Sequence, residues 1–327
     1  MNVAVGVVSP NAAWVLPRRF VDQLRSEFPQ HLFVDAWDRE ALRRVLVDAD
    51  AAFAAFVDAD LVPSLTALRW VQAPAVGVGH ILSPELVASP IVLTSARGVR
   101  ARAIAEHVLG LTLALARQIH TAIRHQVRHE WALDEIEASG AIKTLQGGRM
   151  GIVGLGAIGA EVAGIARAFG MRVSGIRKRF DQPPPRGVDE VLPPERLPDL
   201  LATCDVVVLS APLTRETLHL IGDDALRFVK PGALLINIGR GQLVDDAAVI
   251  RALRDGRLGG AALDVFTHEP LDPSSPYWDL PNVIVTPHSS GAMEDYWSPL
   301  VRLFADNLRR FEAGEPLVNV VDKAAGY

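Results

Sequence analysis

The sequence predicts an α/β protein built from two doubly wound parallel-sheet domains. Short aliphatic runs alternate with amphipathic helical stretches along most of the 327 residues, which is typical of parallel sheets covered by helices. A glycine motif, Gly154-x-Gly156-x-x-Gly159, joins one such run to a helical stretch. Three further runs between Gly232 and Gly291 each lead into a polar residue. Because ligands bind at the carboxyl ends of the strands in such sheets, these polar residues predict one site.

Length and composition narrow the class of protein. A chain of 327 residues is long enough for about two domains, and the formal net charge of −5 argues against a nucleic-acid or anionic-membrane partner. No apolar run reaches the roughly 18 residues of a membrane helix, and the apolar N-terminus lacks the cationic start of a signal peptide. The single cysteine, Cys204, precedes an apolar run, so we expect it to pack in a core. One cysteine also fits a reducing cytoplasm.

The first hundred residues predict a small α/β domain. Its expected strands are Val3–Val8, Leu32–Trp37, Ala51–Phe56, Arg69–Ala73 and Ile91–Thr94. A helix over Ala101–Ile119 follows, with apolar residues on nearly every side, which indicates deep burial or a subunit contact. The next segment, Thr121–Leu145, is polar and aromatic by turns, and we expect it to project from its domain as a dimer arm would.

A second α/β domain opens at Arg149. Its expected strands are Met150–Val153, Arg172–Ile176, Val206–Leu209, Ala233–Ile238, Ala261–Phe266 and Val283–Pro287, with a helix over Ile158–Phe169 after the first of them. Proline clusters between residues 183 and 198 indicate loops, because periodic structure resumes on both sides. A last helix over Tyr296–Phe311, ending at Gly314, has no partner strand in this domain, so we expect it to pack on the first domain.

The glycine motif lies between an expected strand and an expected helix. Gly154 permits a tight turn, Gly156 lets the backbone approach a pyrophosphate, and Gly159 lets the helix pack on the sheet. The N–H groups that open the helix, among them those of Ala157 and Ile158, stand at the positive end of its dipole, where an anion binds. The motif alone is a weak signal, but its position between strand and helix predicts a dinucleotide site.

The residues after the second strand of this domain select the dinucleotide. An NAD site expects Asp or Glu about 20 residues beyond the glycines, where it holds the ribose 2′-hydroxyl. Here Ile176 is followed by Arg177, Lys178 and Arg179, and no acid occurs before Asp181. Arginine makes charge-assisted bonds to a 2′-phosphate, so NADP is favoured over NAD. The alternative is a basic loop that is simply solvated.

Polar residues at the strand ends fit the reduction of a 2-keto acid, which needs a proton donor and an anchor for the carboxylate. His288 can donate the proton, and Glu269 can hold its ring in one tautomer and stabilise its protonated form. Arg240 can bind the carboxylate in bidentate fashion and polarise the carbonyl. Asp264 is a candidate acceptor for the carboxamide of the nicotinamide. Each residue alone has a structural alternative, such as a surface ion pair or a turn, so their joint placement carries the prediction.

Other histidines are weaker candidates. His268 lies beside Glu269 and should point away if Glu269 points inward. His125 and His129 have the spacing of a metal pair, but no third ligand follows, so we expect them on a helix surface and expect no metal.

These motifs resemble the D-isomer-specific 2-hydroxyacid dehydrogenases, and the likeness extends over nearly the whole chain. The matching segments are Gly154–Gly159, Pro212–Thr214, Ile236–Gly241, Leu263–Phe266 with Glu269-Pro270, Thr286–His288 with Gly291, Ala103–His107 with Arg117, and Val76–Val78. The resemblance implies a flavodoxin-like substrate domain from residues 1–98 and 292–327, and an inserted Rossmann dinucleotide-binding domain from residues 99–291. It also implies a cleft between the domains and a homodimer.

The resemblance assigns single residues as well. It implies cofactor contacts at Pro212 and Ile238, and a substrate loop in which the N–H groups of Val76 and Gly77 meet the carboxylate. Gly79 stands where the family usually has Asp. This departure puts the rigidity and the pocket shape of that loop in question.

Within the family, the basic run after the second strand and the closing segment Val321–Tyr327 resemble the glyoxylate/hydroxypyruvate reductases. The regulatory domain of many phosphoglycerate dehydrogenases is missing, and Glu269 stands where a formate dehydrogenase would have glutamine. The predicted activity is the reduction of a small 2-keto acid, such as glyoxylate or hydroxypyruvate, to the D-2-hydroxy acid. The hydride comes from NADPH or NADH, and His288 is the general acid.

Two other functions stay open. A dinucleotide-sensing protein, like the corepressors that share this fold, would bind the cofactor without turnover, although such proteins usually carry extra partner-binding tails. A relative that uses another substrate, such as phosphite, would reduce the cofactor without acting on keto acids. The sequence does not name the side chain of the substrate. The aromatic candidates to contact it are Trp14, Phe53, Tyr296 and Trp297.

Overall fold

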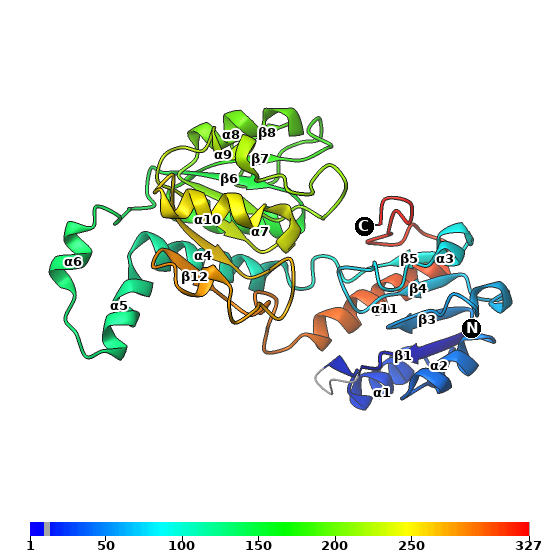
Figure 1. Ribbon diagram of the computed structural model, residues 1–327. Helices are drawn as coiled ribbons and strands as arrows, with labels where there is room; N and C mark the ends of the chain where they lie inside the picture. The colour runs from blue at the N-terminus through cyan, green and yellow to red at the C-terminus, as the bar shows by residue number, and fades with distance from the viewer. Residues whose placement is uncertain (10–13, 327) are drawn as a thin grey trace. The chain divides into compact units, whose positions relative to one another are not determined.

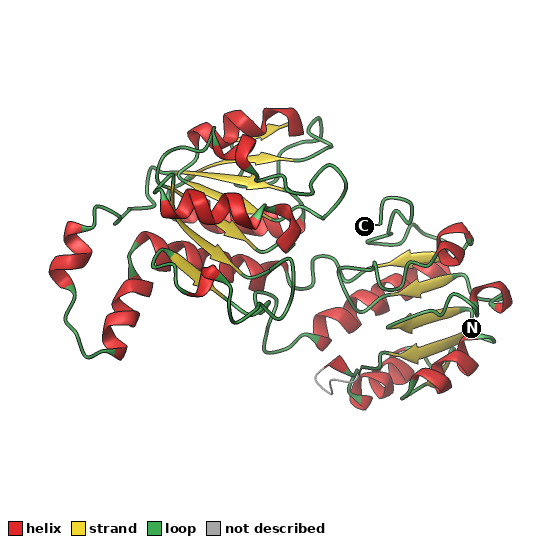
Figure 2. Cartoon of the chain, viewed as in Figure 1, coloured by secondary structure: helices red, strands yellow, loops and turns green. Residues whose placement is uncertain are grey.

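The computed structural model describes residues 1–9 and 14–326, so Tyr327 of the closing segment lies outside the described residues. The chain divides into two compact units, of which unit 1 is Met1–Val99 with Met293–Tyr327 and unit 2 is Arg100–Ala292. Figures 1 and 2 show each unit as a sheet covered by helices. All strand pairings within the described parts of both sheets are parallel. The predicted fold class is therefore confirmed.

Unit 1 is built on five strands in the order β2-β1-β3-β4-β5, which is the order of flavodoxin-like sheets. Its strands are β1 (Asn2–Gly6), β2 (Leu32–Asp35), β3 (Ala51–Ala54), β4 (Trp70–Gln72) and β5 (Val92–Thr94). Its helices are α1 (Arg18–Glu27), α2 (Arg39–Leu46), α3 (Pro84–Ala88) and α11 (Trp297–Ala313), with a 3-10 turn, η2 (Val62–Ser64). The start of α2 is fixed by Asp38, whose carboxylate accepts from the N–H of Ala41 over 2.7 Å.

The C-terminal helix α11 returns to unit 1, as predicted from its lack of a partner strand. It ends at Gly314, which caps it with φ +68°. Its apolar face packs in the same core as α1 and the sheet, where Phe304 stacks on Phe53 and on Trp70 with ring centroids 4.8 and 5.2 Å apart. The suggestion that Phe53 contacts the substrate is wrong, because this ring is fully buried and is used for packing.

Unit 2 is a seven-stranded sheet in the order β12-β11-β10-β9-β6-β7-β8. Counted from β6, this is the Rossmann order 3-2-1-4-5-6 with one strand added. The strands are β6 (Arg149–Val153), β7 (Arg172–Ile176), β8 (Glu190–Leu192), β9 (Val206–Leu209), β10 (Ala233–Asn237), β11 (Leu258–Leu263) and β12 (Val283–Val285). The helices are α4 (Ala101–Ala116), α5 (Ile119–Val127), α6 (Leu133–Ala138), α7 (Ala157–Ala168), α8 (Leu197–Thr203), α9 (Asp223–Leu226) and α10 (Asp246–Arg254), with 3-10 turns η3 (Pro194–Arg196), η4 (Gly241–Leu243) and η5 (Pro276–Trp278).

Helix α4 is largely buried in unit 2, which was one of the two predicted alternatives, the other being a subunit contact. It is shorter than the predicted helix over Ala101–Ile119. It packs along α7 and against β10 and β11. It ends at Ala116 because Gln118 takes a left-handed backbone with φ +57°, and α5 begins at the next residue. Figure 1 shows α5 and α6 projecting from the rest of unit 2, where the sequence predicts an arm.

Several strands end earlier than predicted, and one strand was not predicted. Strand β11 ends at Leu263 rather than at Phe266, so Asp264 lies just beyond its strand. The edge strand β8 is missing from the prediction, because three residues after a proline-rich loop leave no periodicity to detect.

Cys204 packs in the core of unit 2, as predicted. A Cβ added to Gly151 would lie 2.9 Å from its Sγ, and burial raises the pKa of the thiol to about 11. The thiol is therefore protonated and unreactive at neutral pH.

A separate prediction concerned membrane segments. No helix in the described part of the chain is long and apolar enough to cross a membrane.

Candidate active site

The glycine motif forms the turn between β6 and α7. Gly154 adopts φ +98°, and a Cβ there would lie 2.3 Å from the backbone nitrogen of Ala211. A Cβ on Gly159 would lie 2.9 Å from the carbonyl oxygen of Gly154, so the helix lies directly on the turn. Gly156, by contrast, has nothing within 4 Å of its Cβ position. The turn therefore leaves open space beside Gly156, the residue that precedes α7.

The first N–H groups of α7 have no protein partner. Those of Ala157, Ile158 and Gly159 donate to none of the described residues, and the first to bond back is Ala160, to the carbonyl of Gly156 over 2.9 Å. Unpaired donors at the positive end of a helix, beside open space, bind a phosphate or pyrophosphate. The turn therefore fits the dinucleotide predicted from the sequence.

The end of β9 closes one side of this turn. Ser210 Oγ donates to the carbonyl of Gly154 over 2.8 Å. Pro212 follows, and its carbonyl accepts from Thr217 Oγ1 over 2.7 Å. Ile238 is buried just after β10, and its N–H donates to the carbonyl that ends β9. Pro212 and Ile238 thus lie at the carboxyl edge of the sheet, where the resemblance implies cofactor contacts.

In the basic run after β7, Arg177 is bonded within its own loop, while Lys178 and Arg179 are exposed. Arg177 donates through Nη2 to the carbonyl oxygens of Gln182 and Pro183, at 2.5 and 2.8 Å, and its Nε is buried without a partner in the described part of the chain. Lys178 Nζ lies 3.7 Å from the carboxylate of Glu216, and Arg179 is exposed. Arg177 therefore folds its own loop and still carries a donor without an acceptor.

Arg240 lies in a turn that the buried side chain of Asn237 stabilises. The side chain of Asn237 accepts from the N–H of Gly239 over 3.1 Å and donates to the carbonyl of Arg240 over 3.0 Å. A Cβ on Gly241 would lie 1.9 Å from the carbonyl carbon of Phe266, so this turn packs directly on the segment after β11. The Arg240 side chain is exposed, with Nη1 on the carbonyl of Gly239 at 2.6 Å. The packing brings Arg240 to the same edge as the residues that follow β11.

His288 and Glu269 form a hydrogen-bonded pair. His288 Nδ1 lies 2.7 Å from Glu269 Oε2, while Glu269 Oε1 accepts from the N–H of Phe266 over 2.9 Å. The carboxylate is held at both oxygens, and it fixes the proton of the ring on Nδ1. The His288 side chain is 52 % exposed. Its Nε2 is therefore the nitrogen that can exchange a proton with a ligand.

The loop that carries His288 is anchored on Asp264. The fully buried Asp264 carboxylate accepts from Thr286 Oγ1 over 2.6 Å and from the N–H groups of Ser289 and Ser290 over 2.8 and 3.0 Å. The N–H of His288 donates to the Asp264 carbonyl over 2.9 Å. These bonds hold His288 at φ +52°, a conformation uncommon outside glycine. The contact of Asp264 with the nicotinamide stays a prediction.

His107 of α4 extends this anchor. Its Nε2 lies 3.3 Å from Thr286 Oγ1 and 3.8 Å from Asp264 Oδ1. Because the Thr286 hydroxyl donates to Asp264, His107 must be the donor to Thr286. Burial lowers the pKa of His107, although Asp264 opposes the shift. His107 and Thr286 lie in segments that match the family, but neither was assigned a role from the sequence, since a contact between residues 179 positions apart leaves no local pattern. Asn237 had a usable signal, namely a polar residue that ends an apolar strand.

In unit 1, the segment after β4 presents several unpaired N–H groups, including two adjacent ones at Val76 and Gly77. Those of Val76 and Gly77 donate to none of the described residues, whereas the carbonyl of Ala75 accepts from the N–H of Ala96 over 3.0 Å. Two adjacent donors without acceptors fit the carboxylate predicted for this loop. A Cβ on Gly79 would meet nothing within 4 Å, so open space surrounds the position that departs from the family pattern.

Two histidines weighed as weaker candidates, His268 and His125, do not join this arrangement. His268 is exposed while Glu269 contacts His288, as predicted. The two ring nitrogens of His125 lie 2.8 Å from Glu130 and 3.2 Å from Glu135. No group of three or more side chains that could hold a metal ion occurs among the residues that the structure describes.

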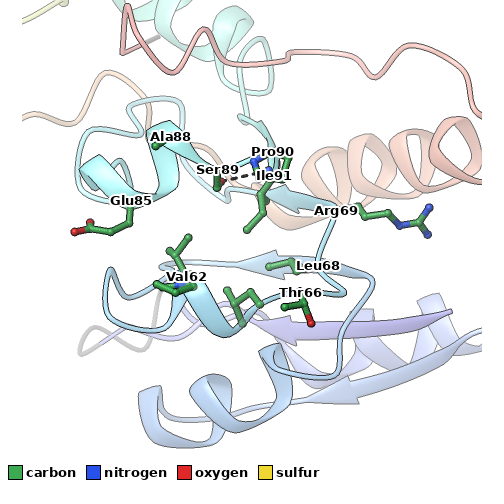
Figure 3. Close-up of a pocket in the computed structure, with 11 residues that line it drawn as sticks. Val62, Thr66, Leu68, Arg69, Glu85, Ala88, Ser89, Pro90 and Ile91 are labelled. Atoms are coloured by element: carbon green, nitrogen blue, oxygen red, sulfur yellow. Dashed lines mark hydrogen bonds between the residues drawn. The ribbon is translucent and has the colours of Figure 1, made fainter.

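A pocket of about 540 Å³ in unit 1 also lies apart from the candidate site. It opens between η2 and α3 over an apolar floor of buried side chains, namely Val62, Leu65, Leu68 and Ile91. Figure 3 shows Ser89 directed toward Ile91 and the Arg69 side chain extending away from the other lining residues. Residues 69 and 91 precede β4 and β5, so the pocket is at the amino edge of the sheet. Val76 and Gly77 follow β4 and belong to the opposite edge.

Fold and geometry together define a dinucleotide-binding α/β protein with an acid–base pair at the carboxyl edge of its Rossmann sheet. A sequence profile of the NAD binding domain of D-isomer specific 2-hydroxyacid dehydrogenases matches residues 109–290. A glyoxylate reductase of Korarchaeum cryptofilum is 35% identical over 310 residues, which cover 91% of this chain and 92% of that protein. The chain belongs to the D-isomer-specific 2-hydroxyacid dehydrogenase family.

Two solved structures share the whole architecture. A D-isomer specific 2-hydroxyacid dehydrogenase of Xanthobacter autotrophicus, in complex with NADPH and MES, is 29% identical with a TM-score of 0.81, and the match covers 99% of both chains. An NADPH-dependent glyoxylate/hydroxypyruvate reductase of Sinorhizobium meliloti, in complex with NADP and sulfate, is 28% identical with a TM-score of 0.80, and the match covers 100% of both chains.

Proposed function

We propose that this protein reduces a small 2-keto acid, glyoxylate or hydroxypyruvate, to the D-2-hydroxy acid with a nicotinamide dinucleotide as hydride donor. The observation that carries the proposal is the bond between His288 Nδ1 and Glu269 Oε2, 2.7 Å long, in a Rossmann unit whose glycine turn offers unpaired N–H groups. Relatives named glyoxylate reductase and glycerate dehydrogenase support the class of substrate.

Each polar residue then has its own task. His288 donates a proton from Nε2 to the carbonyl oxygen as negative charge develops there. Glu269 keeps Nδ1 protonated and stabilises the imidazolium before the transfer. Arg240 binds the substrate carboxylate and polarises the carbonyl. Val76 and Gly77 offer their unpaired N–H groups to the carboxylate.

The cofactor fits the turn between β6 and α7. We assign its pyrophosphate to the unpaired N–H groups of residues 157–159, with further contacts at Pro212 and Ile238 and with the carboxamide at Asp264. When bound, the reduced nicotinamide supplies the hydride that adds to the keto carbon.

We further propose that NADPH is used in preference to NADH. The support is the charge of Arg177 and Lys178 at the end of β7, where an NAD site would carry an acid, and the Arg177 Nε that lacks an acceptor. The two similar structures were solved with NADPH and NADP. The opposing observation is that Arg177 already bonds to two carbonyls of its own loop.

The activity is tested with purified protein, NADPH and a panel of 2-keto acids that includes glyoxylate, hydroxypyruvate and pyruvate. Loss of NADPH absorbance gives the rate, and chiral chromatography of the glycerate formed from hydroxypyruvate gives the configuration. We expect turnover of glyoxylate and hydroxypyruvate and a D product. Tight NADPH binding without turnover of any keto acid would instead favour a dinucleotide sensor. Reduction of NADP by phosphite without keto-acid activity would favour a different substrate.

We also propose that the protein is a homodimer joined through α5 and α6. Ile119, Ile123 and Val127 form one stripe along α5 and are 45, 54 and 77 % exposed, and Trp131 in the following loop is 92 % exposed. An apolar stripe of this kind is a usual sign of a protein interface, and a second copy is the commonest partner. Light scattering on wild type and on an Ile123→Lys, Val127→Glu variant tests this. We expect a dimer and a monomer, and a variant that stays dimeric would refute the assignment.

We place the protein in the cytoplasm. The support is the single cysteine, Cys204, which is buried and free and leaves the fold independent of disulfides.

A further inference from the structure

The candidate substrate loop after β4 has few bonds of its own. Its N–H groups at Val76 and Gly77 are unpaired among the described residues, and Gly79 is surrounded by open space. Such a loop must still be ordered to bind a carboxylate. The apparent affinity falls with the fraction of molecules in which the loop has the binding conformation. Contacts from outside the loop must therefore hold it.

Tyr296, just before α11, makes such a contact. Its hydroxyl donates to the carbonyl of Pro74, two residues beyond the end of β4. Tyr296 is 9 % exposed, and its ring lies edge-on to Trp14 at 5.6 Å and tilted against Trp297 at 5.2 Å. Aromatic neighbours on two sides fix the position from which the hydroxyl reaches Pro74.

The bond from Tyr296 holds the carbonyl of Pro74 at the start of the loop. A second hydrogen bond holds the carbonyl of the next residue, Ala75. The carbonyl of Pro74 and the N–H of Ala75 form one peptide group. The carbonyl of Ala75 and the N–H of Val76 form the next. Tyr296 holds the first carbonyl, and the N–H of Ala96 holds the second. Because a peptide group is planar, holding its carbonyl also orients its N–H. Two consecutive peptide planes are thus set, and the second of them carries the unpaired N–H of Val76.

We propose that Tyr296 is a positioning residue. Through Pro74 it orders the loop that presents the N–H groups of Val76 and Gly77 to the substrate carboxylate. The inference rests on the proposed role of this loop in substrate binding. The Tyr296 hydroxyl acts at the start of the loop, while the buried side chain of Val78 and the bond between His80 Nε2 and the carbonyl of Ala55 hold its far end.

The Tyr296→Phe variant removes the hydroxyl and keeps the ring between Trp14 and Trp297. We expect the KM for glyoxylate to rise about 3- to 10-fold, as for the loss of one hydrogen bond. The values of kcat and of the KM for NADPH should stay unchanged, since the loop is assigned only to the carboxylate. A substrate KM equal to that of the wild type overturns the inference.

Ser89→Ala is the matched control. Ser89 Oγ also donates to a backbone carbonyl in unit 1, that of Leu86 over 2.8 Å, but at the amino edge of the sheet. It accepts as well from the N–H of Ile91 over 3.3 Å, the bond drawn in Figure 3. The substitution should lower the thermal midpoint about as much as Tyr296→Phe and leave the KM for glyoxylate unchanged. A KM increase as large as that of Tyr296→Phe would mean that general loosening of unit 1, not the bond to Pro74, is responsible.

A second substitution tests the ordering itself. The backbone of Gly79 is not in the left-handed region, and its Cβ position is open, so alanine fits without strain. Alanine restricts the disordered loop more than glycine does. Gly79→Ala in the Tyr296→Phe background should therefore lower the KM for glyoxylate again, toward the wild-type value. No recovery would show that the hydroxyl does not act by ordering the loop.

Oxalate binding separates this inference from the proposed activity. Quenching of tryptophan fluorescence by oxalate, with NADP present, gives a dissociation constant without turnover. If the wild type reduces no keto acid but binds oxalate, the proposed function fails. Weaker oxalate binding by Tyr296→Phe would then still support the positioning role. Equal oxalate binding by the two proteins, or no binding by either, overturns that role.

Discussion

The backbone N–H of His288 donates to the carbonyl oxygen of Asp264 over 2.9 Å. Asp264 is also the first residue of the segment that leads to Glu269, so both members of the histidine–glutamate pair are positioned from the end of one strand, β11. The Asp264 side chain adds bonds to the N–H groups of Ser289 and Ser290. A buried carboxylate thus sets the geometry of an exposed acid–base pair.

Replacing that carboxylate should slow the reaction. Asp264→Asn keeps one acceptor oxygen but turns an amide NH₂ toward groups that are themselves donors. The loss of a charge-assisted bond is worth roughly 1.5–3 kcal/mol, or about 10- to 150-fold, and we expect it in kcat. Thr286→Val removes the bond that the hydroxyl donates to the Asp264 carboxylate and the bond that it accepts from His107, so it should lower kcat by a similar factor. Steady-state kinetics decide the case. An effect confined to the KM for NADPH would favour nicotinamide binding by Asp264 over anchoring.

The charge of Glu269 should set the alkaline limit of activity. Glu269→Gln keeps an acceptor for Nδ1–H but removes the negative charge that stabilises the imidazolium. Because ketone reduction needs protonated His288, the variant should lose activity at lower pH than the wild type. We expect the upper limit of the kcat/KM profile to move to lower pH. A profile that only drops in height, with the same limit, would contradict this role.

Two histidines, the partly buried His107 and the buried His120, should make stability depend on pH. Burial lowers the pKa of His107 and of His120 from the ordinary value of 6.5. As the pH falls below about 6.5, the unfolded chain therefore binds protons that the folded chain does not bind until lower pH. The free energy of unfolding should be fully retained above that pH and decrease below it.

Removing one of these groups tests the assignment. His107→Gln should reduce the slope of the unfolding free energy against pH below about 6.5, measured by urea denaturation at several pH values. His268→Gln is the control, because this side chain is exposed and its removal should leave the slope unchanged. The same slope in His107→Gln and wild type would argue against a lowered pKa of His107 in the folded chain.

The basic run should decide the choice of cofactor. Arg177→Asp should lower kcat/KM for NADPH by about 10- to 150-fold, from the loss of a charge-assisted bond worth roughly 1.5–3 kcal/mol. NADH should be used as well as before or better, since an acid can accept from the ribose hydroxyl. Arg179→Ala is the control in the same run. A parallel loss with both cofactors would show that Arg177 serves only to fold its loop.

The parts of the site that have a local pattern could be predicted from the sequence. The glycine turn follows from the spacing of Gly154, Gly156 and Gly159 between a strand and a helix. Arg240, Glu269 and His288 follow from their places after consecutive strands, because parallel strands bring their carboxyl ends to one edge. The packing of α11 on unit 1 follows from the absence of a strand to pair with it.

The remaining features depend on contacts between distant residues, and no local pattern encodes them. His107 meets Thr286 across 179 positions, and Tyr296 meets Pro74 across 222. The helix that ends at Ala116 was predicted to be longer because its apolar pattern continues, while the left-handed turn at Gln118 has no sequence signal. Tertiary packing overrides propensity at such points.

The central claim, that His288 is the general acid of a 2-keto acid reductase, is tested most directly by one comparison. It is the kcat/KM for hydroxypyruvate reduction by NADPH in the wild type and in His288→Ala, with NADPH binding measured in both. We predict turnover by the wild type, a loss of about 10²–10⁴-fold in the variant, and equal NADPH affinity. A wild type without turnover, or a variant within a few-fold of it, would contradict the claim.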